Sequence, residues 1–385
     1  MDNFTLFNPT KILFGKGQLE CMQQEIPAGA KVLILYGGGS VKRTGLLDRV
    51  KIALTSFDTV EFGGIEPNPE YETLMKAATL VRAEKFNFLL AVGGGSVIDG
   101  TKFIAAAAPF KGADPWMIPS QRAPISEAIP FGTVLTLPAT GSEMNCGAVI
   151  TRRSACMKLG FSSTLLYPRF SVLDPEFTFT LPERQTGNGI VDTFVHVTEQ
   201  YLTYPDDALI QDRWAEGLLL TLIQEGPKAL KSPQDYHARA NLMWASTLAL
   251  NGYIGAGVPL DGASHKIGHA ITALYGIDHA RTLAPVLPAL LTVMKDEKRA
   301  KLLQYARRVW CLDCADEDAA IDEGILRTSA FFESVGVPVH LSAYHLGTEV
   351  VGRVLENLTR TGMTAIGENG TITPDKIEKI LNIAL

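Results

Sequence analysis

The residues best suited to chemistry in this chain are four of its seven histidines and one nearby acid. Asp192 and His196 are four positions apart, as are His265 and His269, so in a helix each pair would lie on one face, one turn apart. His279 follows shortly after the second pair. Imidazoles with one carboxylate suit Zn²⁺ or Fe²⁺, whereas Ca²⁺ and Mg²⁺ prefer oxygen ligands. The pattern predicts a site for one divalent metal ion.

The other three histidines lack such neighbours and are interpreted as ordinary core or surface residues: His237, His340 and His345.

Two glycine-rich turns follow predicted strands and precede predicted helices. They are Gly37-Gly38-Gly39-Ser40 and Gly93-Gly94-Gly95-Ser96. Glycine lets the backbone approach a ligand closely, and the N–H groups at a helix start attract phosphate. The spacing is that of neither the ordinary Rossmann fingerprint nor the P-loop. The turns indicate a nucleotide site, with tight structural turns as the alternative.

The first of these turns also bears on the choice of nucleotide. An NAD site is expected to place an acid after the first strand, to accept from the ribose 2′-hydroxyl, and none stands there. Instead Ser40 offers a hydroxyl, and Lys42 and Arg43 bring positive charge that suits a 2′-phosphate. NADP is therefore favoured over NAD, the alternative being a helix start with solvated basic residues.

The elements that must position these residues change along the chain. Buried runs at 32–36, 88–92, 133–137 and 170–173 predict strands, and helical spacing between them, at 70–85 and 96–108, predicts a parallel sheet covered on both faces. After Leu181-Pro182, long amphipathic stretches predict helices at 210–225, 239–250 and 300–309, with a further helix beginning at Gly189. We expect an α/β domain over 1–180 and an all-helical domain over 181–385.

Composition narrows the function classes. A net charge of −6 has the wrong sign for a nucleic-acid partner. No signal peptide is apparent, and the uncharged stretch 241–260, broken by three glycines and a proline, is interpreted as a buried helix entering a loop and not as a membrane span. Five scattered cysteines do not indicate a disulfide framework. A cytoplasmic protein is expected.

With these residues in hand, the chain resembles the iron-containing, or group III, alcohol dehydrogenase family. Within it, the chain is most similar to the branch of NADPH-dependent aldehyde reductases and butanol dehydrogenases. The motifs that carry the resemblance span essentially the whole sequence and are Phe14–Gly17, Phe62–Pro69, Gly93–Lys102, Leu137–Glu143 and the Asp/His set.

The resemblance implies a Rossmann-like nucleotide-binding domain followed by an all-α metal-binding domain, the fold also found in dehydroquinate synthase. It places the metal ligands on Asp192, His196, His265 and His279, with iron or zinc as the ion, and puts His269 near the nicotinamide. Asp99 and His269 are the implied proton-relay residues. The implied cofactor residues are Gly37, Gly38, Ser40, Gly94, Gly95, Ser96, Asp99, Thr136, Thr140 and Lys158.

Two departures from the usual family pattern concern the cofactor. NAD-using members carry an acid where Gly38 stands, which agrees with the NADP interpretation. The usual Thr-Ala-Gly-Thr-Gly-Ser-Glu loop is here Leu137-Pro138-Ala139-Thr140-Gly141-Ser142-Glu143, the form of the aldehyde reductase branch.

The implied reaction is hydride transfer from NADPH to short- and medium-chain aldehydes, with the metal polarising the carbonyl. The implied assembly is a homodimer. The alternatives are a polyol dehydrogenase of the glycerol type, a dehydroquinate synthase relative, and a non-catalytic nucleotide-binding metalloprotein.

Overall fold

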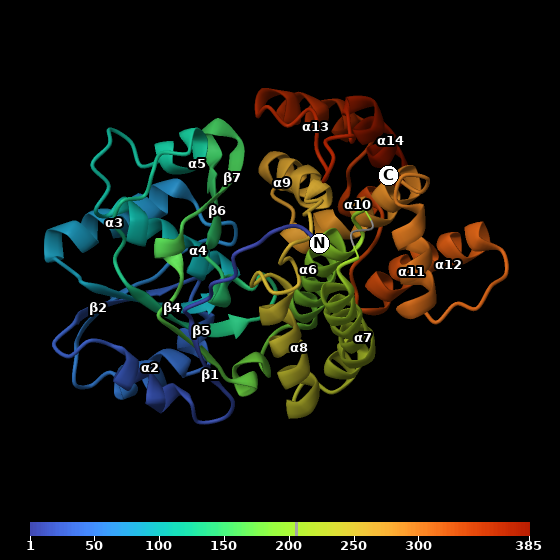
Figure 1. Ribbon diagram of the computed structural model, residues 1–385. Helices are drawn as coiled ribbons and strands as arrows, with labels where there is room; N and C mark the ends of the chain where they lie inside the picture. The colour runs from blue at the N-terminus through green and yellow to red at the C-terminus, as the bar shows by residue number, and fades with distance from the viewer. Residues whose placement is uncertain (205–206) are drawn as a thin grey trace. The chain divides into compact units, whose positions relative to one another are not determined.

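The computed structural model describes residues 1–204 and 207–385 (Figure 1). The chain divides into two compact units. One comprises Phe7–Leu181, and the other comprises Pro182–Leu385 together with Met1–Leu6. The terminal segment joins the second unit through a hydrogen bond from the Asp2 N–H to the Gly257 carbonyl, 2.9 Å long.

The unit Phe7–Leu181 is built on a six-stranded sheet whose neighbouring strands are all parallel. In spatial order the strands are β1 (Lys11–Phe14), β8 (Phe170–Leu173), β5 (Phe131–Leu137), β4 (Phe88–Gly94), β2 (Lys31–Tyr36) and β3 (Asp58–Phe62). The chain passes from β2 to β3 on one side and then to β4 on the other. The strand order therefore reverses between β2 and β4, where open α/β sheets bind their ligands.

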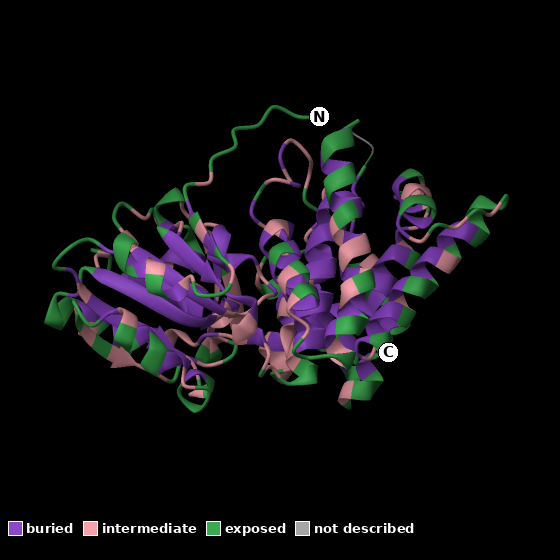
Figure 2. Ribbon diagram, turned by 90° about the horizontal axis from the view of Figure 1, so that it is seen from below, coloured by how far each residue is buried: buried purple, intermediate pink, exposed green. Residues whose placement is uncertain are grey.

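Both faces of this sheet are covered. On one face, Val32, Ile34 and neighbouring strand residues pack against α1 (Ser40–Arg43), α2 (Leu46–Ala53) and the 3-10 helix Leu19–Glu25. On the other face lies α4 (Gly95–Ala107), which contacts β2, β4 and β5 and packs against α3 (Tyr71–Glu84). Figure 2 shows the sheet buried and the outer helix faces exposed. Two-sided burial explains why the central strands are uninterrupted apolar runs.

Two smaller elements complete the unit. An antiparallel hairpin joins β6 (Gly147–Arg152) to β7 (Met157–Ser162), and β6 contacts α4. The short helix α5 spans Met117–Gln121 and contacts β7.

The second unit is mainly helical, and its described residues include one isolated β-bridge, between Ile366 and Ile372, but no longer strand. Its helices are α6 (Glu183–Tyr201), α7 (Leu209–Lys231), α8 (Tyr236–Ala249), α9 (Ala263–Tyr275), α10 (His279–Val293), α11 (Arg299–Arg308), α12 (Glu317–Ser334), α13 (Glu349–Arg360) and α14 (Pro374–Ala384). One apolar core, with Phe194, Leu283 and Phe332 fully buried, links α6 to α14. No described helix is both long enough and apolar enough to cross a membrane.

The predicted fold class, an α/β part followed by a helical part, is confirmed. The four predicted strands and the predicted helices are present, but α6 begins earlier than predicted. We expected a helix from Gly189, and it begins at Glu183. Pro182 precedes it with φ −57°, a value suited to helix initiation, and Glu183 supplies the acid that favours a first turn.

Candidate metal centre and cofactor loops

Three helices of the second unit carry the residues of the predicted metal centre. α6 presents Asp192 and His196, both buried, and α9 presents His265 and His269. α10 begins at His279. The Asp278 side chain, just before it, accepts from Arg184 Nε of α6 at 2.9 Å and from Asn188 at 3.1 Å. These contacts hold the start of α10 against α6.

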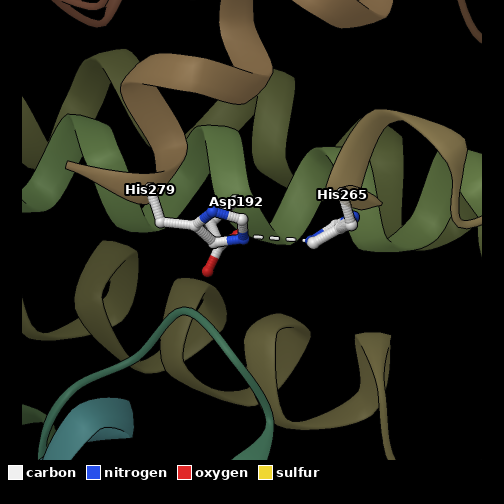
Figure 3. A group of neighbouring side chains, drawn as sticks. All are labelled: Asp192, His265 and His279. Carbon is white, nitrogen blue, oxygen red and sulfur yellow. Dashed lines mark ion pairs between the residues drawn. The ribbon is translucent and has the colours of Figure 1, made fainter. Parts of the chain in front are cut away.

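The donor atoms converge on one carboxylate oxygen. Asp192 Oδ1 lies 3.7 Å from His265 Nε2 and 3.9 Å from His279 Nε2. One donor atom from each of these three residues falls within 4.8 Å of the other two, and Figure 3 shows the side chains turned toward one another.

The fourth predicted ligand and the additional histidine lie beside this group of three. His196 has Nδ1 3.9 Å from Asp192 Oδ1, and its ring stacks on that of His265 with centroids 4.4 Å apart. The His269 ring lies 4.7 Å from that of His279. The structure therefore brings all five predicted side chains into one cluster.

The cluster fits a divalent ion. Asp192 Oδ1 and His265 Nε2 are buried and have no hydrogen-bond partner among the described residues, and an unpaired buried polar atom is costly. Ligand bonds of about 2.0–2.2 Å in a tetrahedral site put neighbouring donors roughly 3.4 Å apart. The observed separations of 3.7–3.9 Å are close to that spacing.

One further functional candidate, Glu199, was missed by the sequence analysis. Its Oε2 lies 2.6 Å from His265 Nδ1, and its Oε1 accepts from the His265 backbone N–H at 3.1 Å. Burial alone would lower the pKa of His265, but the Glu199 and Asp192 carboxylates outweigh it and raise that pKa to about 10. A signal was present, since Glu199 lies three residues beyond His196 on the same helix face.

Except for Lys158, the predicted cofactor residues of the α/β unit lie at the carboxyl ends of three adjacent strands, β2, β4 and β5. After β2 come Gly37, Gly38 and Ser40, and the end of β4 and the start of α4 carry Gly94, Gly95, Ser96 and Asp99. Thr136 lies in β5, and Thr140 follows it.

Gly94 and Gly95 allow residues that follow β5 to lie close to the start of α4. A Cβ on Gly95 would lie 2.5 Å from Thr140 Oγ1, and one on Gly94 would lie 3.0 Å from the Leu137 side chain. The N-cap residue of α4 is Gly94, so no capping side chain competes with a ligand for the first N–H groups of the helix. These features fit a phosphate-bearing ligand.

A buried lysine, also missed by the sequence analysis, holds the loop between β5 and β6. Lys102 of α4 is fully buried and donates to Ser142 Oγ at 2.8 Å, Asn145 Oδ1 at 2.9 Å and the Gly147 carbonyl at 2.7 Å. Burial lowers its pKa to about 8. Ser142 in turn donates to Asp99 Oδ1 at 2.5 Å. Asp99 is thus anchored within this network, and burial raises its pKa.

Basic residues expected near the nucleotide already have contacts in the protein. Lys42 forms an ion pair with Glu61 at 3.2 Å and lies over the Tyr36 ring, whereas Arg43 is exposed. Lys158 of β7 donates to Asn68 Oδ1 at 2.9 Å.

Comparison with known proteins places this architecture in a family. Residues 9–175 match the iron-containing alcohol dehydrogenase model, and residues 186–385 match that of the C-terminal part of the Fe-containing alcohol dehydrogenase family. The chain belongs to this family of oxidoreductases, which confirms the resemblance and the prediction of an enzyme of the alcohol dehydrogenase type.

Individual relatives are similar over the full length. The chain is 58% identical to the NADPH-dependent aldehyde reductase YqhD of Escherichia coli K12, over 100% of both chains. It is 41% identical to a probable NADH-dependent butanol dehydrogenase of Bacillus subtilis, also over 100% of both. The comparison with the crystal structure of E. coli YqhD gives a TM-score of 0.99. The matched region covers 100% of this chain and 99% of the YqhD chain. A butanol dehydrogenase structure from Thermotoga maritima, 35% identical, has a TM-score of 0.96, with coverage of 100% and 99%.

Proposed function

We propose that this protein is a metal-dependent aldehyde reductase that uses NADPH. The observation that carries the proposal is the convergence of Asp192 and three imidazoles, in a family of alcohol dehydrogenases. Asp192, His196, His265 and His279 would hold one divalent ion, Fe²⁺ or Zn²⁺. We assign nucleotide binding to residues 1–180 and metal and substrate binding to residues 181–385.

The reaction is hydride transfer to an aldehyde carbonyl. When bound, NADPH supplies the hydride, and the ion supplies positive charge that stabilises negative charge growing on the carbonyl oxygen. The protein contributes a preorganised ligand cluster, so little rearrangement is needed when the ion binds. His269, whose ring lies 4.7 Å from that of His279, and Asp99 are the candidates for passing a proton to the product oxygen.

The preference for NADPH rests on the turn after β2. Gly38 has nothing within 4 Å of the position a Cβ would take, and the turn 37–40 itself carries no carboxylate that would repel a phosphate. The nearby Glu61 carboxylate is ion-paired with Lys42. Ser40 at the start of α1 supplies a hydroxyl for hydrogen bonding. Lys158 and the turns at Gly94–Ser96 and Thr136–Thr140 would hold the remainder of the nucleotide.

Short- and medium-chain aldehydes are the proposed substrates. The names of the relatives, an aldehyde reductase and butanol dehydrogenases, favour this class over polyols. An apolar wall discriminates by only about 1–3 kcal/mol per methylene, so selectivity for chain length should be shallow. We further propose a homodimer in the cytoplasm.

The test compares propanal, butanal and hexanal reduction with NADPH against glycerol oxidation with NAD, each followed at 340 nm with purified, metal-loaded protein at neutral pH. Of the reactions compared, butanal reduction with NADPH should have the highest kcat/KM. If glycerol oxidation with NAD outpaces butanal reduction, the protein is a polyol dehydrogenase of the same fold. Absence of turnover with every pair would favour a non-catalytic metalloprotein.

A further inference from the structure

We propose that Glu199 is a positioning residue of the metal centre, which fixes the ring orientation and the tautomer of His265. It contacts neither substrate nor ion in this assignment and acts only through His265. The inference rests on the proposed metal site and adds to it a residue outside the predicted ligand set.

Both carboxylate oxygens of Glu199 contact the same residue, His265. Glu199 is 5% exposed, and its two carboxylate oxygens contact two of the three nitrogens of His265: the ring Nδ1 at 2.6 Å and the backbone N at 3.1 Å. The contact with the backbone N–H holds the Glu199 carboxylate against the first turn of α9, and the contact with Nδ1 then restrains the rotation of the imidazole.

The contact also decides which ring nitrogen carries hydrogen. A carboxylate only accepts hydrogen bonds, so the Nδ1 of His265 must donate. In the neutral ring the lone pair then lies on Nε2, the atom 3.7 Å from Asp192 Oδ1 in the ligand cluster. In the other tautomer, Nδ1 would be an acceptor facing the Glu199 carboxylate, which is also an acceptor. Its Nε2–H would point at the ion. Glu199 thus selects the tautomer that can bind a metal.

A second set of contacts holds Glu199 and the start of α9 together. The Asp261 N–H donates to the Glu199 carbonyl at 2.9 Å, and Asp261 Oδ1 accepts from the Ala263 N–H, also at 2.9 Å. Lys298, 3% exposed, forms an ion pair with Asp261 at 2.8 Å. The loop before α9 is therefore tied to α6 at the turn that carries Glu199. The carboxylate reaches His265 from a fixed backbone.

Replacement by glutamine separates positioning from bulk. Glu199→Gln preserves size, but its amide has one acceptor and one donor end, whereas His265 needs two acceptors. Either the backbone N–H faces an NH₂ group, or the NH₂ donates to Nδ1 and imposes the tautomer that blocks Nε2. Glu199→Asp keeps the charge and shortens the reach by one methylene, so it can no longer span both contacts.

The matched control is Glu216→Gln on α7. Glu216 is also a buried carboxylate, 8% exposed, and accepts from Tyr201, Gln304 and Arg308 at 3.0–3.2 Å, with no contact to the ligand cluster. It therefore measures the effect of removing a buried negative charge from the same unit.

The experiment measures Zn²⁺ affinity by chelator competition and the visible spectrum of the Co²⁺-substituted protein, with thermal unfolding of each apoprotein as a fold check. We expect Glu199→Gln to weaken Zn²⁺ binding by about 10- to 100-fold and to alter the Co²⁺ spectrum, with Glu199→Asp intermediate. Glu216→Gln should bind Zn²⁺ like the wild type, whatever its stability.

The outcomes distinguish this inference from the proposal beneath it. Wild-type protein that binds no Zn²⁺ would overturn the proposed metal site and this inference with it. Wild-type protein that binds one ion per chain, with unchanged affinity and Co²⁺ spectrum in Glu199→Gln, would overturn the positioning role alone. If Glu199→Gln does not fold, Glu199→Asp decides: wild-type affinity and spectrum in that variant would refute the role.

Discussion

The same substitution at two helical glycines should change stability in opposite directions. Gly187 lies in α6, where an added Cβ would sit 2.1 Å from the Val335 carbonyl oxygen at the end of α12. That is far inside the ~3.5 Å at which nonbonded atoms make favourable contact. Gly217 lies on the exposed face of α7, with nothing within 4 Å of its Cβ position.

The magnitudes follow from these surroundings. Gly217→Ala gains helix propensity, about 0.5–1 kcal/mol, which should raise Tm by roughly 1–4 °C. Gly187→Ala gains the same propensity, but α6 must move away from a backbone atom that cannot rotate aside. Overpacking of this kind costs about 1–3 kcal/mol. We expect the upper end of that range and a net loss of about 2 kcal/mol, or roughly 4–8 °C in Tm.

Scanning calorimetry of the two variants beside the wild type measures both shifts. If Gly187→Ala raised Tm as Gly217→Ala should, the close approach of α6 to the end of α12 would be wrong. Because α6 also carries Asp192 and His196, that result would remove support for the geometry of the metal centre.

The remaining predictions concern the α/β unit. The pKa of Lys102 is lowered from 10.5 to about 8 by burial, so the unfolded chain binds this proton more tightly and stability should rise, by about 3 kcal/mol, as pH increases from about 8 to about 10.5. Urea midpoints at both pH values should show this rise in the wild type and not in Lys102→Met; equal rises would refute the burial of the charge. Gly38→Asp should raise KM for NADPH by about 10- to 100-fold through repulsion of about 1–3 kcal/mol and leave KM for NADH nearly unchanged. Gly38→Ala is its control, and equal effects on both cofactors would contradict the assignment. Gly95→Ala should weaken NADPH binding about tenfold, since the methyl group displaces Thr140; fluorescence titration giving wild-type affinity would show that this turn does not hold the nucleotide.

The central strands could be predicted from the sequence because strands that are buried on both faces consist of continuous apolar runs. The edge strand β3 was missed because Asp58 and Val60 are exposed and its remaining residues are only half-buried. The β6–β7 hairpin was missed for a similar reason, since Ala148 and Ile150 are its only buried strand residues and the others are half-buried or exposed. Polar residues over Glu183–Thr186 likewise concealed the first turns of α6.

The metal cluster was predictable to the extent that helical spacing shows it. Asp192 with His196 and His265 with His269 are local pairs, and their type and period suffice to put each pair on one face. Glu199 and Lys102 act through contacts 66 residues away and 40 to 45 residues away, respectively. The spacing from His196 marks Glu199 as a candidate, but no local period shows that its partner is His265 or which residues Lys102 contacts. Only the folded chain brings these groups together.

The central claim, that one divalent ion is held by Asp192, His196, His265 and His279, is tested most directly by metal analysis. Wild-type protein and His265→Ala are loaded with Zn²⁺, freed of excess ion and measured for metal per chain, with circular dichroism to verify folding. The wild type should retain one ion per chain, and the folded variant should lose it. Full occupancy in a folded His265→Ala protein would contradict the ligand assignment.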